Sequence, residues 1–318
     1  LAFFLKPKPS VPVQPAMGCS VGHVSFEDAY EIGQHLGAGS FGCVFEVTRR
    51  GRREKDRPRA VKVIRHGEQQ LLIPSLEVDD AKEQKQLKVQ PHHISEMEIW
   101  HKVSHCQGCV KLMETFEGGQ YSYAVMERCG PSLMDSFNEV INWDEDELAH
   151  LFRGMLLPLV YLHGRRIAHR DVKPDNFLFA SSVDRRSVKL CDFGMAAFIP
   201  KVPGFLRGRF GTAPYMSPEM AKGAGHSFST DVWSMAASMY MMLFGEFVYM
   251  PAEIHNVKAV RACIIHDYPR PKFRRRKGIS DVPVSKDATA FVAKLLQRSP
   301  IKRYTAQEAS HLKFVSGA

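Results

Sequence analysis

The amino-acid sequence predicts an α+β fold with two lobes, on three observations. Residues 30–63 alternate in strand fashion, with β-branched and aromatic residues between glycine turns. Apolar residues recur at helical spacing over 145–164, 230–244 and 286–297. The length of 318 residues suits one large domain or two lobes around one cleft. Strands that precede helices in this way indicate a small β-rich lobe, a larger helical lobe and a ligand cleft between them.

The remaining segments fit this division. Residues 110–129 give two further strand-like runs, and residues 94–103 carry a short helical pattern. Residues 65–92 are polar and rich in Gln and Lys without a clean period, which indicates an inserted loop or an irregular helix. We therefore expect a flexible flank, an N-lobe, a C-lobe and a short tail at residues 1–29, 30–129, 130–314 and 315–318.

The composition excludes little. A net charge of +9 permits nucleic acid, anionic lipid or acidic protein as a partner, but it selects none of them. We do not expect nucleic-acid binding. The seven cysteines are scattered and no secretory signal precedes them, which indicates reduced thiols in an intracellular, cytoplasmic protein. Cys106 and Cys109 form one CxxC pair, weak evidence for zinc without a second pair. No apolar run reaches the ~18 residues of a membrane span.

A glycine-rich segment points to phosphate binding. It matches the pattern G-x-G-x-x-G-x-V, in which glycines let the backbone approach phosphate oxygens. A dinucleotide-binding turn has similar spacing but is followed by a helix, whereas a second strand follows here, which favours a hairpin over ATP. The residues of this expected ATP-binding segment are Gly37, Ala38, Gly39, Ser40, Phe41, Gly42 and Val44.

The next strand carries Lys62, which can neutralise the α- and β-phosphates or stand as an ordinary surface lysine. Its expected ion-pair partner is Glu96 on the helix that follows, with Glu98 as the competitor.

A cluster of polar residues further along is far more specific. In the run from His169 to Asn176, Asp171 can accept the proton of an attacking hydroxyl and Lys173 can sit on the γ-phosphate. The amide oxygen of Asn176 suits Mg²⁺, and Asp192, in Asp-Phe-Gly, supplies the main carboxylate for the metal. Phosphoryl transfer needs these groups because the protein's work is positioning and charge neutralisation.

With these motifs in order, the chain resembles the eukaryotic protein kinase superfamily from about Tyr30 to Phe314. Within it, the chain looks most like the calcium/calmodulin-dependent and calcium-dependent group. That likeness rests on the sequences at 210–219, 231–234, 243–246 and 303–306. The resemblance implies a serine/threonine protein kinase that uses ATP and Mg²⁺ on protein substrates. A pseudokinase scaffold is the alternative, and a small-molecule kinase conflicts with the long peptide-positioning segment at 194–219.

The resemblance also assigns supporting roles. It implies that Glu219 pairs with Arg303, that Asp231 braces the backbone of the His169 loop, and that Thr212 contacts Asp171 and Lys173. It places an apolar stack at Trp100, Leu112, His169 and Phe193, and an adenine site at Val44, Ala60 and Leu178, with Met126 as gatekeeper and Glu127 to Cys129 as hinge.

Several positions depart from the group. Residues 130–133 and 173–178 also resemble the casein-kinase-one family, although that family lacks the Ser-Pro-Glu motif found here at 217–219. Where the calcium group carries a Glu after the hinge, Ser132 or Leu133 stands, with Asp135 as a substitute, and Met241 occupies a position that is acidic in some Arg-directed relatives. A basic run at 270–277 is either a docking surface or part of a groove that favours acidic substrates.

Regulation is expected to come from outside the activation segment. Residues 193–211 contain no Ser, Thr, Tyr, Asp or Glu, so Arg170 has no phosphate to capture there. Control would come from a regulatory tail, a partner or the 65–95 insertion. Membrane contact is expected only if Gly18 and Cys19, after Met17, are acylated, and Gly22 stands where that motif wants Ser or Thr.

Overall fold

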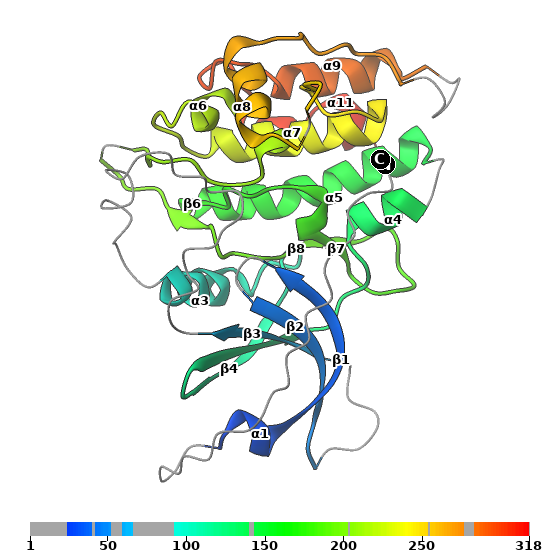
Figure 1. Cartoon of the computed structure of the whole chain (residues 1–318). Coiled ribbons are helices and arrows are strands. Elements are labelled where there is room, and N and C mark those ends of the chain that lie inside the picture. The colour runs from blue at the N-terminus through cyan, green and yellow to red at the C-terminus, as the bar shows by residue number, and fades with distance from the viewer. Residues whose placement is uncertain are drawn as a thin grey trace. The chain divides into compact units, whose positions relative to one another are not determined.

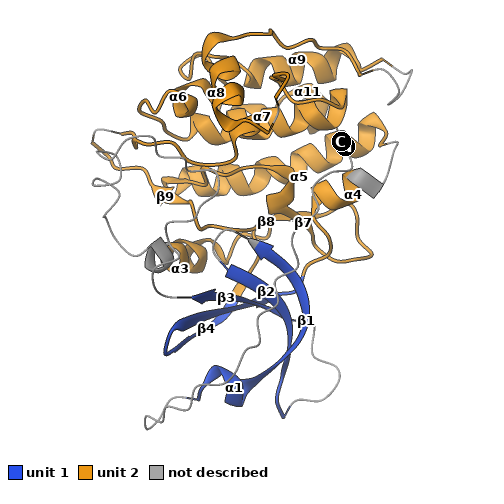
Figure 2. Ribbon diagram, viewed as in Figure 1, with its two compact units in different colours: residues 1–71, 113–128 blue, residues 72–112, 129–318 orange. Residues whose placement is uncertain are grey.

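The computed structural model describes residues 24–39, 42–51, 59–65, 92–139, 143–202, 204–253, 255–276 and 283–317. The chain divides into two compact units (Figure 2). The first comprises Leu1–Leu71 and Met113–Arg128, and the second comprises Leu72–Leu112 and Cys129–Ala318.

The first unit is built on a five-stranded sheet in the order β1-β2-β3-β5-β4. Gly39 and Gly42 face each other where β1 ends and β2 begins, and β1, β2, β3 and β5 pair antiparallel in that order. The strands are β1 (Tyr30–Gly39), β2 (Gly42–Arg49), β3 (Arg59–Arg65), β4 (Leu112–Gly118) and β5 (Tyr121–Glu127). The strands expected at 30–63 and 110–129 are therefore present.

The first unit begins earlier than the sequence suggested. Helix α1 (Phe26–Ala29) is capped by Ser25 and precedes β1 directly. Phe26 is buried in the core with Tyr30, Val47 and Tyr123, and its ring stacks on Tyr123 at 4.2 Å between centroids. The expected flexible flank of 1–29 is therefore wrong for residues 25–29, because a buried aromatic side chain holds them on the sheet.

The second unit is mainly helical (Figure 1). Every residue of α7 from Thr230 to Phe244 is buried, as expected for a helix that is covered on all sides. Figure 1 shows α7 between α5 and α9, both of which pack against it. The helices are α3 (His92–Val103), α4 (Leu133–Glu139), α5 (Glu145–Gly164), α6 (Pro218–Ala221), α7 (Ser229–Phe244), α8 (Val257–His266), α9 (Lys286–Leu295), α10 (Ala306–Ser310) and α11 (Lys313–Ser316).

Short strands and 3₁₀ turns shape the loops of this unit. Strand β6 pairs with β9, and β7 pairs with β8, in two small antiparallel sheets. Their bounds are β6 (Ile167–Ala168), η2 (Pro174–Asn176), β7 (Phe177–Phe179), β8 (Val188–Leu190), β9 (Ala197–Phe198) and η3 (Ala213–Tyr215).

Helix α3 and the segment after it group with the second unit and not with the sheet. The Trp100 indole donates to the Val110 carbonyl at 2.7 Å, and the Val110 N–H donates to the Leu190 carbonyl at 2.9 Å. These bonds tie α3 to β8, so the N-lobe expected at 30–129 does not act as one compact unit. The C-terminal boundary also moves, since Val315 in α11 is fully buried beyond the expected end at Phe314.

No helix among the described residues is long and apolar enough to cross a lipid bilayer. The 66–91 part of the expected insertion, and Gly18 and Cys19, lie outside the described residues.

Candidate active site

The loop after β6 is held by a buried carboxylate on α7. Asp231 accepts hydrogen bonds from the backbone N–H groups of His169 and Arg170, both at 2.8 Å, and His163 Nε2 lies 2.9 Å from the same carboxylate. Arg170 needs this support because its φ of 66° lies in the left-handed region. The brace expected from the resemblance is present, and it includes His163, which the sequence analysis did not name.

The electrostatics of Asp231 match this role. Complete burial alone would raise the pKa of the carboxyl group, but the hydrogen bond and charge of His163, with the backbone donors, outweigh burial and hold the pKa below its ordinary value. Asp231 therefore stays ionised, and an ionised acceptor makes stronger hydrogen bonds to the loop than a neutral one.

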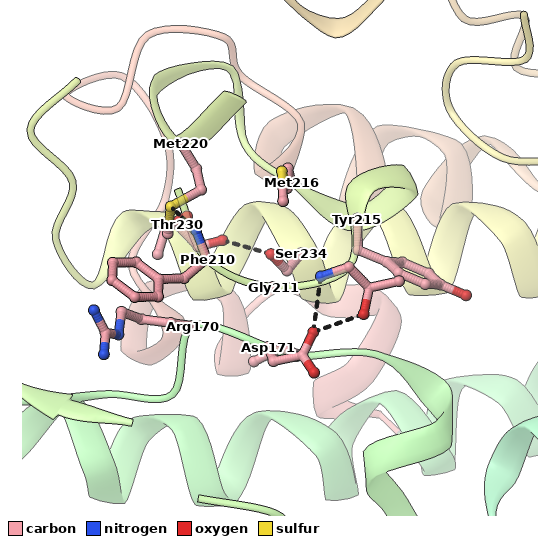
Figure 3. A pocket seen from close by; sticks show the side chains of 11 residues that line it. Arg170, Asp171, Phe210, Gly211, Tyr215, Met216, Met220, Thr230 and Ser234 are labelled. Atoms are coloured by element: carbon pink, nitrogen blue, oxygen red, sulfur yellow. Dashed lines mark hydrogen bonds between the residues drawn. The ribbon is translucent and has the colours of Figure 1, made fainter. Parts of the chain in front are cut away.

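Asp171 stands at the centre of a polar network (Figure 3). Its Oδ1 accepts from the backbone N–H and the hydroxyl of Thr212, both at 2.9 Å. Lys173 Nζ lies 3.1 Å from Asp171 Oδ2 and donates to Thr212 Oγ1 at 2.8 Å. The Asn176 amide nitrogen donates to the Asp171 carbonyl at 2.7 Å. The sequence-predicted residues Asp171, Lys173, Asn176 and Thr212 thus lie together in one network.

Opposing effects act on the charged groups beside Asp171. Burial would lower the pKa of Lys173, but the nearby Asp171 and Asp175 carboxylates raise it overall. Burial also raises the pKa of Asp175, an effect that Lys173 opposes and that Asp135 and Asp171 reinforce. Lys173 therefore remains a cation beside the carboxylate of Asp171.

Aromatic contacts fix the segment that carries Asp192. The Phe193 ring lies 5.5 Å from His169 and 6.1 Å from Trp100, measured between ring centroids. His169 Nε2 lies 3.1 Å from the Cys191 carbonyl oxygen. Asp192 itself has a φ of 61°. Three members of the expected apolar stack are therefore in contact through Phe193, and the fourth, Leu112, is buried.

The activation segment covers Arg170. The Arg170 guanidinium carbon lies 3.9 Å from the centroid of the Phe210 ring (Figure 3). Its Nε donates to the Met195 carbonyl. Burial lowers the pKa of Arg170 to about 10, with Asp231 opposing, which leaves the guanidinium charged at neutral pH. Gly211 follows with a φ of 90°, and a Cβ there would lie 2.5 Å from the Arg170 carbonyl oxygen. No side chain fits at that point.

His226 also packs against Phe210 in an edge-on arrangement, with ring centroids 6.1 Å apart. Neither of its ring nitrogens has a hydrogen-bond partner among the described residues. Burial, followed by the charge of Arg170, lowers the pKa of His226 to about 4, so the imidazole is neutral at neutral pH. The backbones of Leu206 and His226 exchange two hydrogen bonds of 2.9 Å, which anchors the segment.

A buried ion pair ends the activation segment. Arg303 makes two hydrogen bonds to Glu219, at 2.7 and 3.1 Å, and its guanidinium carbon lies 5.1 Å from the Trp233 ring centroid. This pairing of Glu219 and Arg303 is the one expected from the sequence.

The first unit carries the predicted phosphate-binding hairpin. Gly37, Ala38 and Gly39 end β1, and Gly42 and Val44 begin β2, while Ser40 and Phe41 lie outside the described residues. A Cβ at Gly42 would lie 2.2 Å from the Val63 carbonyl oxygen, so the sheet requires glycine there. Lys62 on β3 is 6% exposed and is paired in register with Val44 and with Ala124.

The two candidates for the partner of Lys62 differ in their surroundings. Glu96 on α3 is buried, at 2% exposure. Glu98 is exposed and bonds Lys102 at 2.9 Å on the same helix. This contrast favours Glu96, but Glu96 belongs to the second unit, so its pairing with Lys62 stays a prediction. The adenine site stays a prediction for the same reason: Val44, Ala60, Met126 and Glu127 belong to the first unit, and Cys129 and Leu178 to the second.

No group of three or more His, Cys, Asp or Glu side chains that could hold a metal ion exists among the described residues. This is compatible with Mg²⁺, which proteins bind through one or two carboxylates together with substrate phosphates. The Asn176 amide nitrogen is committed to the Asp171 carbonyl, so the amide oxygen is the atom that suits a cation.

The comparisons with known proteins agree with this site. A family model described as the protein kinase domain matches residues 30–315. Calcium-dependent protein kinase 3 of Plasmodium berghei is 28% identical over 287 residues, which cover 90% of this chain and 46% of that protein. A probable myosin light chain kinase of Dictyostelium discoideum is 27% identical, covering 89% of this chain and 65% of that one. A serine/threonine-protein kinase of Xenopus tropicalis, PLK4, is 27% identical over 89% of this chain and 26% of its own length.

Proposed function

Because this chain belongs to the protein kinase family, we propose that it transfers the γ-phosphate of ATP to serine and threonine hydroxyls of other proteins. The observation that carries the proposal is the network in which Lys173, Thr212 and Asn176 all contact Asp171. A carboxylate held in this way can accept a hydroxyl proton without first having to be oriented. The relatives named above are protein kinases, which supports the same reaction.

We assign the residues as follows. Asp171 accepts the proton of the substrate hydroxyl, and Lys173 stabilises the negative charge that develops on the transferred group. Thr212 holds both side chains through its hydroxyl. Lys62, supported by Glu96, binds the nucleotide phosphates together with the backbone of the glycine hairpin.

A divalent cation, for which we propose Mg²⁺, neutralises phosphate charge when it is bound. The residues that would hold it are Asp192 and Asn176, which supply the carboxylate and amide oxygens that Mg²⁺ prefers.

Serine and threonine are the proposed acceptors. Lys173 lies close to both Thr212 and Asp171. This close polar cluster, like the motif Lys-Pro after Asp171, resembles that of serine/threonine kinases, and the printed names of several relatives say the same of them.

The chain spans 46% and 37% of the length of the first relatives it matches, so a regulatory tail or partner outside this chain is proposed on that ground. Membrane contact is proposed only for a form in which Gly18 and Cys19 are acylated.

A phosphate-transfer assay on a generic protein substrate tests the proposed function. We expect the chain to incorporate phosphate into Ser and Thr, and Asp171→Asn to lower kcat by about three orders of magnitude while nucleotide binding changes little. Asp146→Asn, at an exposed carboxylate on α5, is the matched control and should retain normal turnover. Nucleotide binding without any transfer by the unaltered chain would favour a pseudokinase scaffold instead.

A further inference from the structure

The turn after α3 brings two cysteines together. The Cys106 N–H donates to the Val103 carbonyl at 2.9 Å, and the Cys109 N–H donates to the Cys106 carbonyl at 3.1 Å. The second bond closes a four-residue turn, in which the first and last Cα atoms lie within about 7 Å. Disulfides span Cα separations of about 4.4–6.8 Å. The backbone of the turn is therefore already shaped to accept a bond between the two sulfurs.

The two side chains are free thiols, and both are buried. They differ in exposure, since Cys106 retains 9% of its accessible surface and Cys109 only 1%. A small reagent from solvent would therefore reach Cys106 first. Cys109, the more deeply buried of the two, is placed to react with Cys106 afterwards.

Electrostatics separate the two thiols in the same sense. The hydrogen bond from the Cys109 thiol lowers the pKa of Cys106 to about 7, against the effect of burial, and the backbone N–H groups of the turn and the charge of Arg165 add to it. The same hydrogen bond and burial raise the pKa of Cys109 well above its usual range, with Cys191 adding to the rise and Lys189 opposing it. A substantial part of Cys106 is therefore thiolate at neutral pH, beside a protonated thiol.

We propose that Cys106 and Cys109 are a reversible oxidation site, at which a peroxide converts the two thiols into an intramolecular disulfide. The Cys106 thiolate attacks one peroxide oxygen, the O–O bond breaks, and protonation of the leaving oxygen gives water or an alcohol and a sulfenic acid on Cys106. The Cys109 sulfur then attacks the Cys106 sulfur, forming the S–S bond and releasing the hydroxyl as water with the Cys109 proton. Two thiols are oxidised and one peroxide is reduced; a dithiol reductant reverses the change by exchange.

The setting of the turn supports a disulfide over dispersed oxidation. A Cβ at Gly108, between the two cysteines, would lie 2.9 Å from Pro158 Cδ in α5, so the turn is seated directly on that helix. On its other side, the Leu190 N–H donates to the Gly108 carbonyl at 2.8 Å. A turn fixed on both faces keeps its sulfurs together, which favours closing a ring over capture by a distant thiol.

The same contacts connect the turn to the proposed active site. Leu190, which pairs with Cys109, is followed by Cys191 and then by Asp192. Closing the disulfide changes the turn that these hydrogen bonds hold against Leu190, and it therefore acts on the backbone that carries Asp192. On the proposed kinase function, oxidation should therefore lower turnover reversibly.

Peptide mapping of the full chain tests the site without reference to kinase activity. Trypsin releases both cysteines in one peptide, residues 103–111. After limited hydrogen peroxide and alkylation of remaining thiols, we expect this peptide to be lighter by two hydrogen atoms and unalkylated, and dithiothreitol to restore both thiols. Because the pKa of Cys106 is lowered to about 7, we expect Cys106 to react about threefold or more faster than Cys263 on α8.

Two variants separate the roles of the sulfurs. Cys109→Ser should stop at the sulfenic acid, which dimedone traps on Cys106, whereas Cys106→Ser should leave Cys109 reduced. Cys263→Ser is the control and should leave the bond unchanged. Slower oxidation of Cys106 than of Cys263, or a disulfide to another cysteine, would overturn the proposal. Formation of the disulfide in a chain that transfers no phosphate would refute the proposed function and leave the oxidation site standing.

Discussion

Asp231 is the residue that orders the backbone of the loop that leads to Asp171 in the candidate site. It is fully buried, and its carboxylate orders two successive peptide groups of the loop that ends in Asp171. His163 completes its hydrogen bonding from α5. A neutral amide in this place would accept from fewer donors and would turn its own N–H groups toward other donors.

We expect Asp231→Asn to lower the free energy of unfolding by about 2–4 kcal/mol and to reduce turnover. The pKa of Asp231 is lower in the folded protein than its ordinary value near 3.8, so the stabilisation is present above that value and is lost as the pH falls through the folded pKa. Denaturant titrations should therefore give the same difference at pH ~7 and pH ~5. A difference that disappeared already at pH ~5 would contradict the assigned charge state; the exposed Asp287→Asn serves as control.

Phe210 is a second residue whose role depends on its contact with Arg170. A cation–π contact in a desolvated place contributes about 2 kcal/mol, and here it covers a guanidinium that has no phosphate acceptor in residues 193–211. We expect Phe210→Ala to lower kcat/KM about tenfold, which corresponds to ~1.4 kcal/mol, and Phe210→Tyr to retain most activity because the ring remains.

Phe210 covers Arg170, and residues 193–211 contain no Ser, Thr or Tyr, so we expect activity without phosphorylation of this segment. Treatment of the active enzyme with a phosphatase should leave its turnover unchanged. Loss of activity traced to removal of a phosphate between Phe193 and Gly211 would refute this reading.

The short motifs identified the residues that carry the chemistry, and the family resemblance supplied the distant partners of Glu219 and Asp231. Neither pointed to Phe210 or His163. Asp171, Lys173 and Asn176 lie within one run, and each residue type is dictated by the reaction. Nothing in the amino-acid sequence marks Phe210 or His163 as functional. Only the fold brings Phe210 to Arg170 and His163 to Asp231. One sequence feature bears on Phe210: Arg170 has no Ser, Thr or Tyr in residues 193–211 whose phosphate it could bind. In the fold the Phe210 ring covers Arg170 instead.

At the scale of elements, helix boundaries were predictable where the chain caps itself. The predicted helix at 145–164 matches α5, because Asp144 and Glu147 form a capping box at its start. The grouping of α3 was not predictable, since it follows from long-range contacts of Trp100 and Val110. The short α1 was also missed, because four residues carry too little periodicity to be recognised.

The link between the end of the activation segment and the loop before α10 rests on one side chain. Arg303 donates to both oxygens of Glu219 and to the Ser229 carbonyl. Lysine keeps the charge but cannot form the two parallel bonds. We expect Arg303→Lys to lower the free energy of unfolding by about 1–3 kcal/mol, measured by thermal or chemical denaturation. Arg185→Lys at an exposed site should have no effect, and an equal loss there would show that the pair is not special.

The molecule as a whole is positively charged, but the surroundings of Lys173 in the candidate site are acidic. The chain carries +9 overall, yet Asp135 in α4 and Asp175 in η2, two elements that pack together, lie close enough that Asp135 contributes to the raised pKa of Asp175. Met241 and Ser132, which stand where relatives of the calcium group can carry acidic residues, are buried. From the acidic pair beside Lys173 we expect basic residues near the target hydroxyl to be preferred over acidic ones.

We expect a positional peptide library to show a preference for Arg near the phosphosite, and the preference to weaken as salt is raised, because exposed charges are screened over ~10 Å at 0.1 M. A matched library assay of Asp135→Asn should show a smaller preference. Selection of acidic residues at low salt would instead support a basic groove that involves Lys201, Arg207 or the run at 270–276.

The stacking of Phe26 on Tyr123 sets a practical limit on how the protein can be shortened. A fragment that starts at Tyr30, where the family match begins, would uncover the faces of Tyr123 and Phe116 that Phe26 covers. Such a fragment should have a lower melting temperature and should aggregate more readily than one that starts at Val24, because uncovered aromatic surface promotes association. We therefore expect the smallest stable fragment of this protein to begin before residue 30, where the match to the family model starts.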